Sequence, residues 1–249
     1  MEKKLHILRA IPSLFTVAAF IFGFNSILLA INGQIKEAIT FILIAALLDL
    51  FDGRVARILG VSSKFGAELD SLSDLVCFGI ATAIIVLSYT GSANKLLYLS
   101  AMFFAICSML RLARFNLDIT PPAYAKSFFM GVPTPAGFVL GVLPISIDFA
   151  WDFQVSSMQY GIYLLVIGFL MISNIPTPST KSFHIKKTHF PLIIGAITLL
   201  LICILLYSWV MMSLFGIIYL LSILICILVA KRNKRIFMKT NKENNALEN

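Results

Sequence analysis

Charge is scarce in this sequence. Only 13% of its 249 residues are Asp, Glu, Lys or Arg, whereas 59% are hydrophobic and the mean hydropathy is +0.93. Soluble domains average about 25% charged residues. This shortage excludes an ordinary soluble enzyme and predicts an all-α integral membrane protein.

Several functional signatures are also missing. The four cysteines lie singly inside apolar runs, without the spacing of a metal site, so we interpret them as small hydrophobic side chains. The sequence shows no internal repeat, no glycine-rich phosphate loop and no nucleic-acid-binding module. Membrane orientation accounts for the net charge of +8, and no nucleic-acid partner is expected.

Apolar stretches of about 17–25 residues can cross a bilayer as helices. The first such run is expected to be a membrane helix rather than a cleaved signal. We expect one transmembrane catalytic domain over residues 1–230, followed by a basic, polar tail over residues 231–249. About eight spans are predicted, near residues 10–31, 36–59, 66–89, 96–115, 134–150, 157–175, 189–207 and 210–230.

The basic residues predict the orientation of these spans. An even number of spans places both termini on one side, and Lys3, Lys4 and the tail mark that side as cytoplasmic. On this topology only Lys36 and Lys95, of the 20 lysines and arginines, fall outside. We therefore expect a multi-pass protein of the cell membrane, with both termini and the active site on the cytoplasmic side.

The charge that is present concentrates in "DLFDGRVARILGVSSKFGAELDSLSD", from Asp49 to Asp74. A charged side chain costs roughly 2.5–3.5 kcal/mol near the centre of a membrane helix. Asp49 and Asp52 are three residues apart and Asp70 and Asp74 four apart, so each pair shares a helix face. The short link between the two helices predicts that the pairs face each other across a helix hairpin.

Four facing carboxylates repel one another unless cations neutralise them. Hard oxygen ligands suit Mg²⁺, Mn²⁺ or Ca²⁺, and two such ions can clamp a pyrophosphate during displacement at phosphorus. Gly53 and Gly66 allow a ligand to approach the backbone, and Arg57 offers a cation for phosphate. The structural alternative is a set of buried ion pairs, such as Asp52 with Arg57.

The spacing Asp49-x₂-Asp52-Gly53-x₂-Ala56-Arg57-x₈-Gly66-x₃-Asp70-x₃-Asp74 resembles the CDP-alcohol phosphotransferase signature at every fixed position. The resemblance implies a helical bundle in which all four aspartates bind two Mg²⁺ or Mn²⁺ ions, and it implies that Asp74 is the catalytic base. Members commonly form homodimers, so we expect a homodimer. The CDP-diacylglycerol-binding residues that follow from the signature and its chemistry, together with a threonine retained in the first span, are Thr16, Asp52, Gly53, Ala56, Arg57 and Gly66.

Four further stretches resemble the membrane-embedded phosphatidylserine synthases of this family. They are "DSLSDLVCFGIA", "RLARFN", "FFMGVPTPAG" and "SNIPTPSTK". The resemblance implies transfer of a phosphatidyl group from CDP-diacylglycerol to L-serine, giving phosphatidylserine and CMP. It covers roughly residues 8–182, and the last two spans look like generic apolar helices.

Serine is a zwitterion, so its carboxylate needs a cation near the metals. The serine-binding candidates are Arg111, Arg114, Asn116 and Lys181. The structural alternative for the three cations is that they only contribute to the excess of positive charge found in cytoplasmic loops. Glycerol 3-phosphate or inositol phosphate as acceptor remains open, with the same chemistry.

A cation- or proton-coupled transporter is the alternative from another class. However, all four aspartates lie in one hairpin, whereas transporters are typically built from repeated halves.

Overall fold

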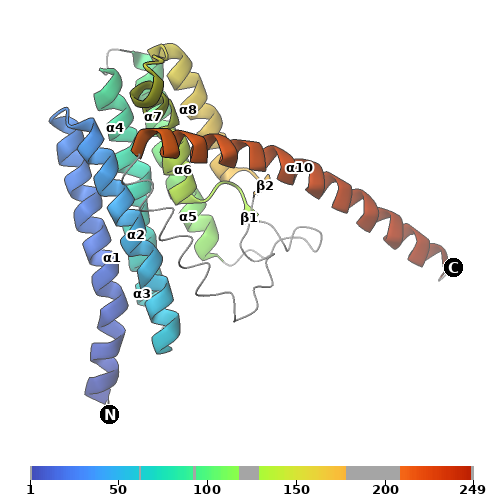
Figure 1. Cartoon of the computed structure of the whole chain (residues 1–249). Helices are drawn as coiled ribbons and strands as arrows, with labels where there is room; N and C mark the ends of the chain where they lie inside the picture. The colour runs from blue at the N-terminus through green and yellow to red at the C-terminus, as the bar shows by residue number, and fades with distance from the viewer. Residues whose placement is uncertain (1, 62, 92–93, 118–128, 178–207, 248–249) are drawn as a thin grey trace.

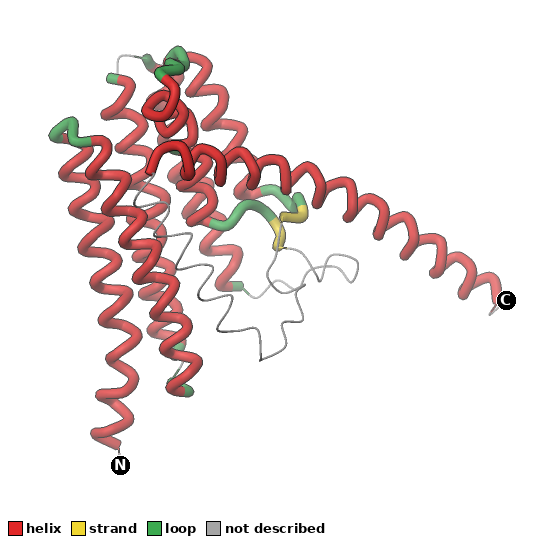
Figure 2. The backbone as a smooth tube through the Cα atoms, viewed as in Figure 1, coloured by secondary structure: helices red, strands yellow, loops and turns green. Residues whose placement is uncertain are grey.

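A computed structural model describes residues 2–61, 63–91, 94–117, 129–177 and 208–247. These residues are helical except for turns, short connections and one pair of two-residue strands, β1 (Phe129–Met130) and β2 (Pro176–Thr177), which pair antiparallel. Figure 2 shows how small this strand pair is beside the helices. The all-α prediction is therefore confirmed for the described part of the chain in all but this detail.

The amino-terminal half forms one long antiparallel helix pair and a third helical segment that returns along it. Helices α1 (Glu2–Ile31) and α2 (Ile35–Leu59) lie side by side along their length (Figure 1). The chain then returns through α3 (Lys64–Asp74), the π-helical segment η1 (Leu75–Ile80) and α4 (Ala81–Thr90), which follow one another without a break.

The second half completes the bundle. Helix α5 (Lys95–Asn116) packs along α8 (Ser157–Ile172), and between them in sequence come α6 (Thr134–Gly141) and α7 (Leu143–Trp151), bent by 40°. Helix α10 (Ser208–Leu247) contacts α7, α6 and β2 before it extends away from the bundle (Figure 1). It crosses the expected boundary at residue 230 without interruption, so the segment expected as a tail is helical as far as Leu247.

Four helical segments are long and apolar enough to span a membrane, or five if α6 and α7 form one bent span. The predicted count of about eight is thus not confirmed. Helix α2 carries Asp49, Asp52 and Arg54 within its length, and α8 has only 16 residues, about 24 Å at 1.5 Å per residue. The predicted span 189–207 lies outside the described residues.

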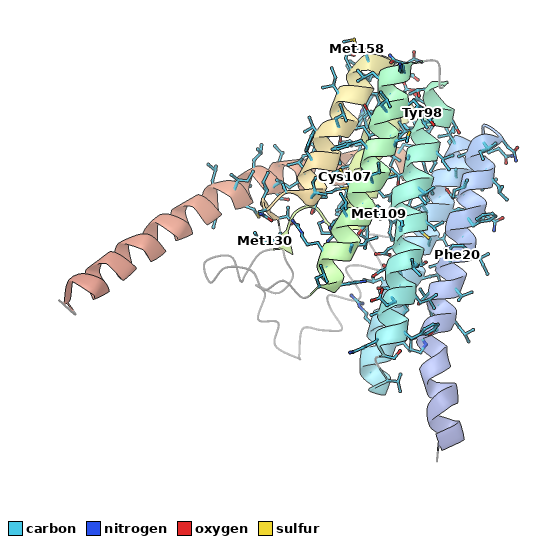
Figure 3. The ribbon with its side chains drawn as sticks, turned by 180° about the vertical axis from the view of Figure 1, so that it is seen from behind. Phe20, Tyr98, Cys107, Met109, Met130 and Met158 are labelled. Carbon is cyan, nitrogen blue, oxygen red and sulfur yellow. The ribbon has the colours of Figure 1, made fainter. Side chains whose placement is uncertain are left out.

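Large apolar side chains cover the outside of the bundle, as expected for a protein that faces lipid. Phe20 of α1 and Tyr98 of α5 are among those exposed there (Figure 3). The interior is also apolar, with Phe78, Phe104 and Phe138 almost fully buried. Apolar surface both outside and inside is typical of helices packed in a bilayer.

Two glycines let the central helical segment approach its neighbours. A Cβ at Gly79 of η1 would lie 2.9 Å from the Ser108 hydroxyl of α5, and one at Gly23 of α1 would collide with the Cys77 sulfur of η1. Small residues at helix contacts are typical of membrane bundles. The η1 segment is therefore held closely between α1 and α5, directly after Asp74.

A third glycine, Gly131, connects β1 to α6 with a left-handed backbone, φ +76°. A Cβ there would collide with the Met171 carbonyl and lie 2.9 Å from the Ser173 carbonyl. We expect Gly131→Ala to destabilise the fold through both strain and collision, by about 2–5 kcal/mol.

Gly33→Ala is the matched control, because Gly33 has φ +80° but no neighbour within 4 Å of an added Cβ. It should cost only the backbone strain, about 1–2 kcal/mol. Thermal unfolding in detergent compares the two variants. Equal losses of stability would contradict the close approach at Gly131.

Candidate active site

The acidic cluster lies where α2 and α3 face each other. One carboxylate oxygen from each of Asp49, Asp70 and Asp74 falls within 4.8 Å of the others. Asp49 comes from α2, whereas Asp70 and Asp74 come from consecutive turns of α3. The hairpin predicted from sequence therefore brings these three carboxylates together.

Local sequence sets the register of α3. The Ser63 side chain caps the helix by accepting the Gly66 N–H at 3.0 Å, so the helix starts at Lys64. Asp70 and Asp74 then stand four residues apart on one face. Gly66 lies in this capped turn. It therefore helps to start the helix, in addition to its predicted contact with CDP-diacylglycerol.

The fourth aspartate is held by the first helix. Asp52 is buried, and its Oδ2 accepts a hydrogen bond of 2.7 Å from the Thr16 hydroxyl of α1. This contact joins the retained threonine to a predicted metal ligand. Ser13 and Ala19 of the same helix stand where the resemblance leads us to expect asparagines, and the Ala19 carbonyl accepts a bond from the Cys77 thiol.

Two carboxylate oxygens of the clustered aspartates have no hydrogen-bond partner among the described residues. Oδ1 of Asp70 and Oδ1 of Asp74 are both buried and make no hydrogen bond among the described residues. Buried polar atoms are nearly always satisfied. Unsatisfied carboxylate oxygens in a group of three fit a hard divalent cation, which prefers oxygen ligands.

Helix α3 gives way to η1 immediately after Asp74. In this segment the Ala81 N–H reaches back to the Val76 carbonyl, five residues away, instead of four. Single π-helical turns are rare and are frequent at functional sites. No pattern in the sequence predicts this turn, because π-helical backbone has no residue signature comparable to a cap.

Arg111 of α5 lies near the acidic cluster. Its guanidinium lies close enough to Asp74 to interact electrostatically, and Nη1 donates to the Thr134 hydroxyl at 2.8 Å. Its Nε–H is buried and has no acceptor among the described residues. Arg111 therefore has a donor free for an anionic group near Asp74.

Arg114, one turn further along α5, is used differently. Its two terminal nitrogens donate four hydrogen bonds of 2.8–3.2 Å, to the Ile172, Met130 and Ser173 carbonyls and to the Asn174 side chain. Four of its five N–H groups are thus engaged. This geometry favours a positioning role over the predicted contact with serine.

Asn116 also makes contacts within the protein. Its side-chain nitrogen donates to Glu68, and its oxygen accepts from Ser71, so it joins the end of α5 to α3.

Among the other predicted residues, Gly53 lies in α2 beside Asp52. The side chains of Ala56 and Arg57, and the whole of Lys181, lie outside the described residues.

Sequence reasoning missed Thr134 and Asn174 as partners of the two arginines. Both lie in stretches that resemble the serine-using branch, "FFMGVPTPAG" and "SNIPTPSTK". A threonine between two prolines at a helix start was the available signal.

The chain matches the CDP-alcohol phosphatidyltransferase family over residues 9–167, more than half of its length. It therefore belongs to this family.

Three relatives carry the same name, CDP-diacylglycerol–serine O-phosphatidyltransferase. The protein of Mycobacterium leprae is 41% identical over 174 residues, 68% of this chain and 58% of its own length. That of Helicobacter pylori is 33% identical over 77% of this chain and 81% of its own. That of Bacillus subtilis is 36% identical over 71% and 92%. The chain thus spans less than two thirds of the mycobacterial relative.

Thr16→Val tests whether the bond to Asp52 supports metal binding. Removing a partner that orients a ligand typically costs 10–100-fold in metal affinity. We expect the Mn²⁺ concentration for half-maximal activity to rise by about that factor. Thr16→Ser, which keeps the hydroxyl, should stay close to the unmodified protein. Equal metal dependence in both variants would contradict the role of this bond.

Proposed function

We propose that the chain transfers the phosphatidyl group of CDP-diacylglycerol to the hydroxyl of L-serine, releasing CMP. The gathering of Asp49, Asp70 and Asp74 into one cluster at the spacing of the family signature carries this proposal. The shared name of the relatives supports CDP-diacylglycerol and serine as the substrates.

Asp49, Asp52, Asp70 and Asp74 are proposed to hold two Mg²⁺ or Mn²⁺ ions. When bound, the metals would polarise the pyrophosphate and neutralise the charge that develops on the leaving CMP. Thr16 orients Asp52 through its hydroxyl. Gly53, Ala56, Arg57 and Gly66 remain the predicted contacts of the donor.

Asp74 is the proposed base. It takes the proton of the serine hydroxyl while the hydroxyl oxygen forms a bond to the phosphorus that carries diacylglycerol. The bond from that phosphorus to the bridging oxygen breaks, and CMP leaves with its electron pair. Arg111 lies beside Asp74 and has an unpaired donor, so it is the proposed partner of the serine carboxylate.

The setting of this reaction is also a proposal. Residues 1–230 would form one catalytic domain in the cell membrane, with the cluster and both termini on the cytoplasmic side and residues 231–249 as a basic tail. The distribution of lysine and arginine supports this orientation. Lys181 as a serine contact and a homodimeric assembly remain predictions.

A product assay tests the function. Purified protein is supplied with CDP-diacylglycerol, Mn²⁺ or Mg²⁺, and serine, glycerol 3-phosphate or inositol phosphate in turn. We expect phosphatidylserine and CMP with serine alone. Turnover with another acceptor and none with serine would contradict the acceptor but keep the reaction class.

Asp49→Asn removes a charge from the cluster while keeping the size of the side chain. We expect activity to fall by at least about a hundredfold, and high serine should not restore it, because the lost group binds metal rather than serine. Asp152→Asn is the control, since it removes the same charge from an exposed left-handed position at the end of α7. Near-normal turnover of Asp49→Asn would contradict the metal site.

Arg111→Ala and Arg114→Ala separate binding from positioning. Losing a hydrogen bond to a charged group costs about 1.5–3 kcal/mol, so Arg111→Ala should raise the KM for serine about ten- to 150-fold and leave CDP-diacylglycerol saturation unchanged. Arg114→Ala should instead lower the unfolding temperature, because it strips four hydrogen bonds from the loops around β1 and β2. Saturation curves in serine and thermal unfolding are measured for both variants. A raised serine KM in Arg114→Ala and a lowered unfolding temperature in Arg111→Ala would contradict these assignments.

A further inference from the structure

Helix α10 brings a hydroxyl to the active-site side of the bundle. It lies beyond residues 9–167, which match the family, and its sequence resembles a generic apolar span. Tyr219 of this helix nevertheless has a buried hydroxyl oxygen. Since a phenylalanine would fill the same space without burying a polar atom, this hydroxyl calls for an explanation.

The neighbours of Tyr219 belong to the machinery described above. The ring packs against the core, and its hydroxyl interacts with Thr177 of β2 and with the charge of Arg111. Thr177 itself donates to the Gly131 carbonyl at 2.8 Å, in the turn that leads to Thr134. Arg111 donates to Thr134 at 2.8 Å. Hydroxyls from α6 and α10 therefore both interact with Arg111, and β2 supplies a neighbour of the Tyr219 hydroxyl.

The other hydroxyls in the described apolar part of α10 have local uses. Ser213 donates to the Trp209 carbonyl and contacts Ser146 of α7, and Ser222 donates to the Tyr219 carbonyl. Both are satisfied within α10 or by its packing on α7. Tyr219 alone among them is associated with the charged residue that faces Asp74.

We propose that Tyr219 is a specificity-determining residue of the acceptor pocket, where its hydroxyl donates to the carboxylate that Arg111 binds. This rests on the proposed transfer to an amino-acid acceptor. A phenol offers one neutral donor next to the guanidinium, which suits the single charge of a carboxylate. The pocket thereby extends to the carboxyl-terminal helix, which lies outside the family match.

Tyr219→Phe tests the proposal, because it removes only the hydroxyl. The KM for serine should rise about tenfold or more, while kcat and the KM for CDP-diacylglycerol change less than about twofold. Ile218→Ala, one residue away and 62% exposed, should leave both saturation curves unchanged. Should the phenylalanine variant fail to fold, Tyr219→Met carries the same test, since its flexible side chain fills irregular space.

An unchanged serine KM in an active Tyr219→Phe variant would overturn the proposal. So would equal changes in both KM values together with a lower unfolding temperature, which would assign Tyr219 to packing. The unmodified protein separates this failure from a wrong proposed function. If it makes no phosphatidylserine, the proposed function itself is contradicted, whereas serine turnover insensitive to Tyr219→Phe contradicts only the acceptor contact.

Discussion

Repulsion among carboxylates that the fold holds together is the constraint on which the site depends. At an effective dielectric constant of 20, two unit charges 4 Å apart repel by about 4 kcal/mol. Asp49, Asp70 and Asp74 bring one oxygen each within 4.8 Å of the others, and two of their oxygens have no partner among the described residues. Membrane insertion makes each such charge more costly still, and this repulsion is the physical reason for proposing divalent cations there.

The surrounding helices hold these carboxylates in place. Helix α1 supplies the Thr16 hydroxyl to Asp52, and the Ser63 cap fixes where α3 begins. Arg114 ties α5 to the chain around both strands, which keeps its neighbour Arg111 beside Asp74. The two arginines thus lie one helical turn apart on α5, Arg114 engaged by the neighbouring loops and Arg111 beside Asp74.

Spacing along the chain was enough to predict the hairpin and its acidic cluster. Residues three and four apart share a helix face, and the short link turns the second helix back on the first, so the sequence positions of Asp49, Asp70 and Asp74 already predict that they lie together. The helical class followed from the apolar composition. These features are local, and local features can be predicted from a single sequence.

Features that depend on distant contacts could not be predicted in this way. The engagement of Arg114 by the Met130 and Ile172 carbonyls joins segments 16 and 58 residues away, and no pattern within "RLARFN" indicates it. The approach of Tyr219 to Arg111 likewise joins distant parts of the chain, whereas the π-helical turn after Asp74 lacks a residue signature. The predicted count of about eight spans stays unconfirmed, because α2 carries charge within its length, α8 is short, and residues 189–207 lie outside the described part of the chain.

We propose that the aspartates hold two divalent ions near each other. Electron paramagnetic resonance of the Mn²⁺-loaded protein tests this without relying on turnover. We expect two bound Mn²⁺ per chain with the spectrum of a magnetically coupled pair, and loss of the coupling in Asp70→Asn. A single uncoupled Mn²⁺, or a spectrum that Asp70→Asn leaves unchanged, would contradict it.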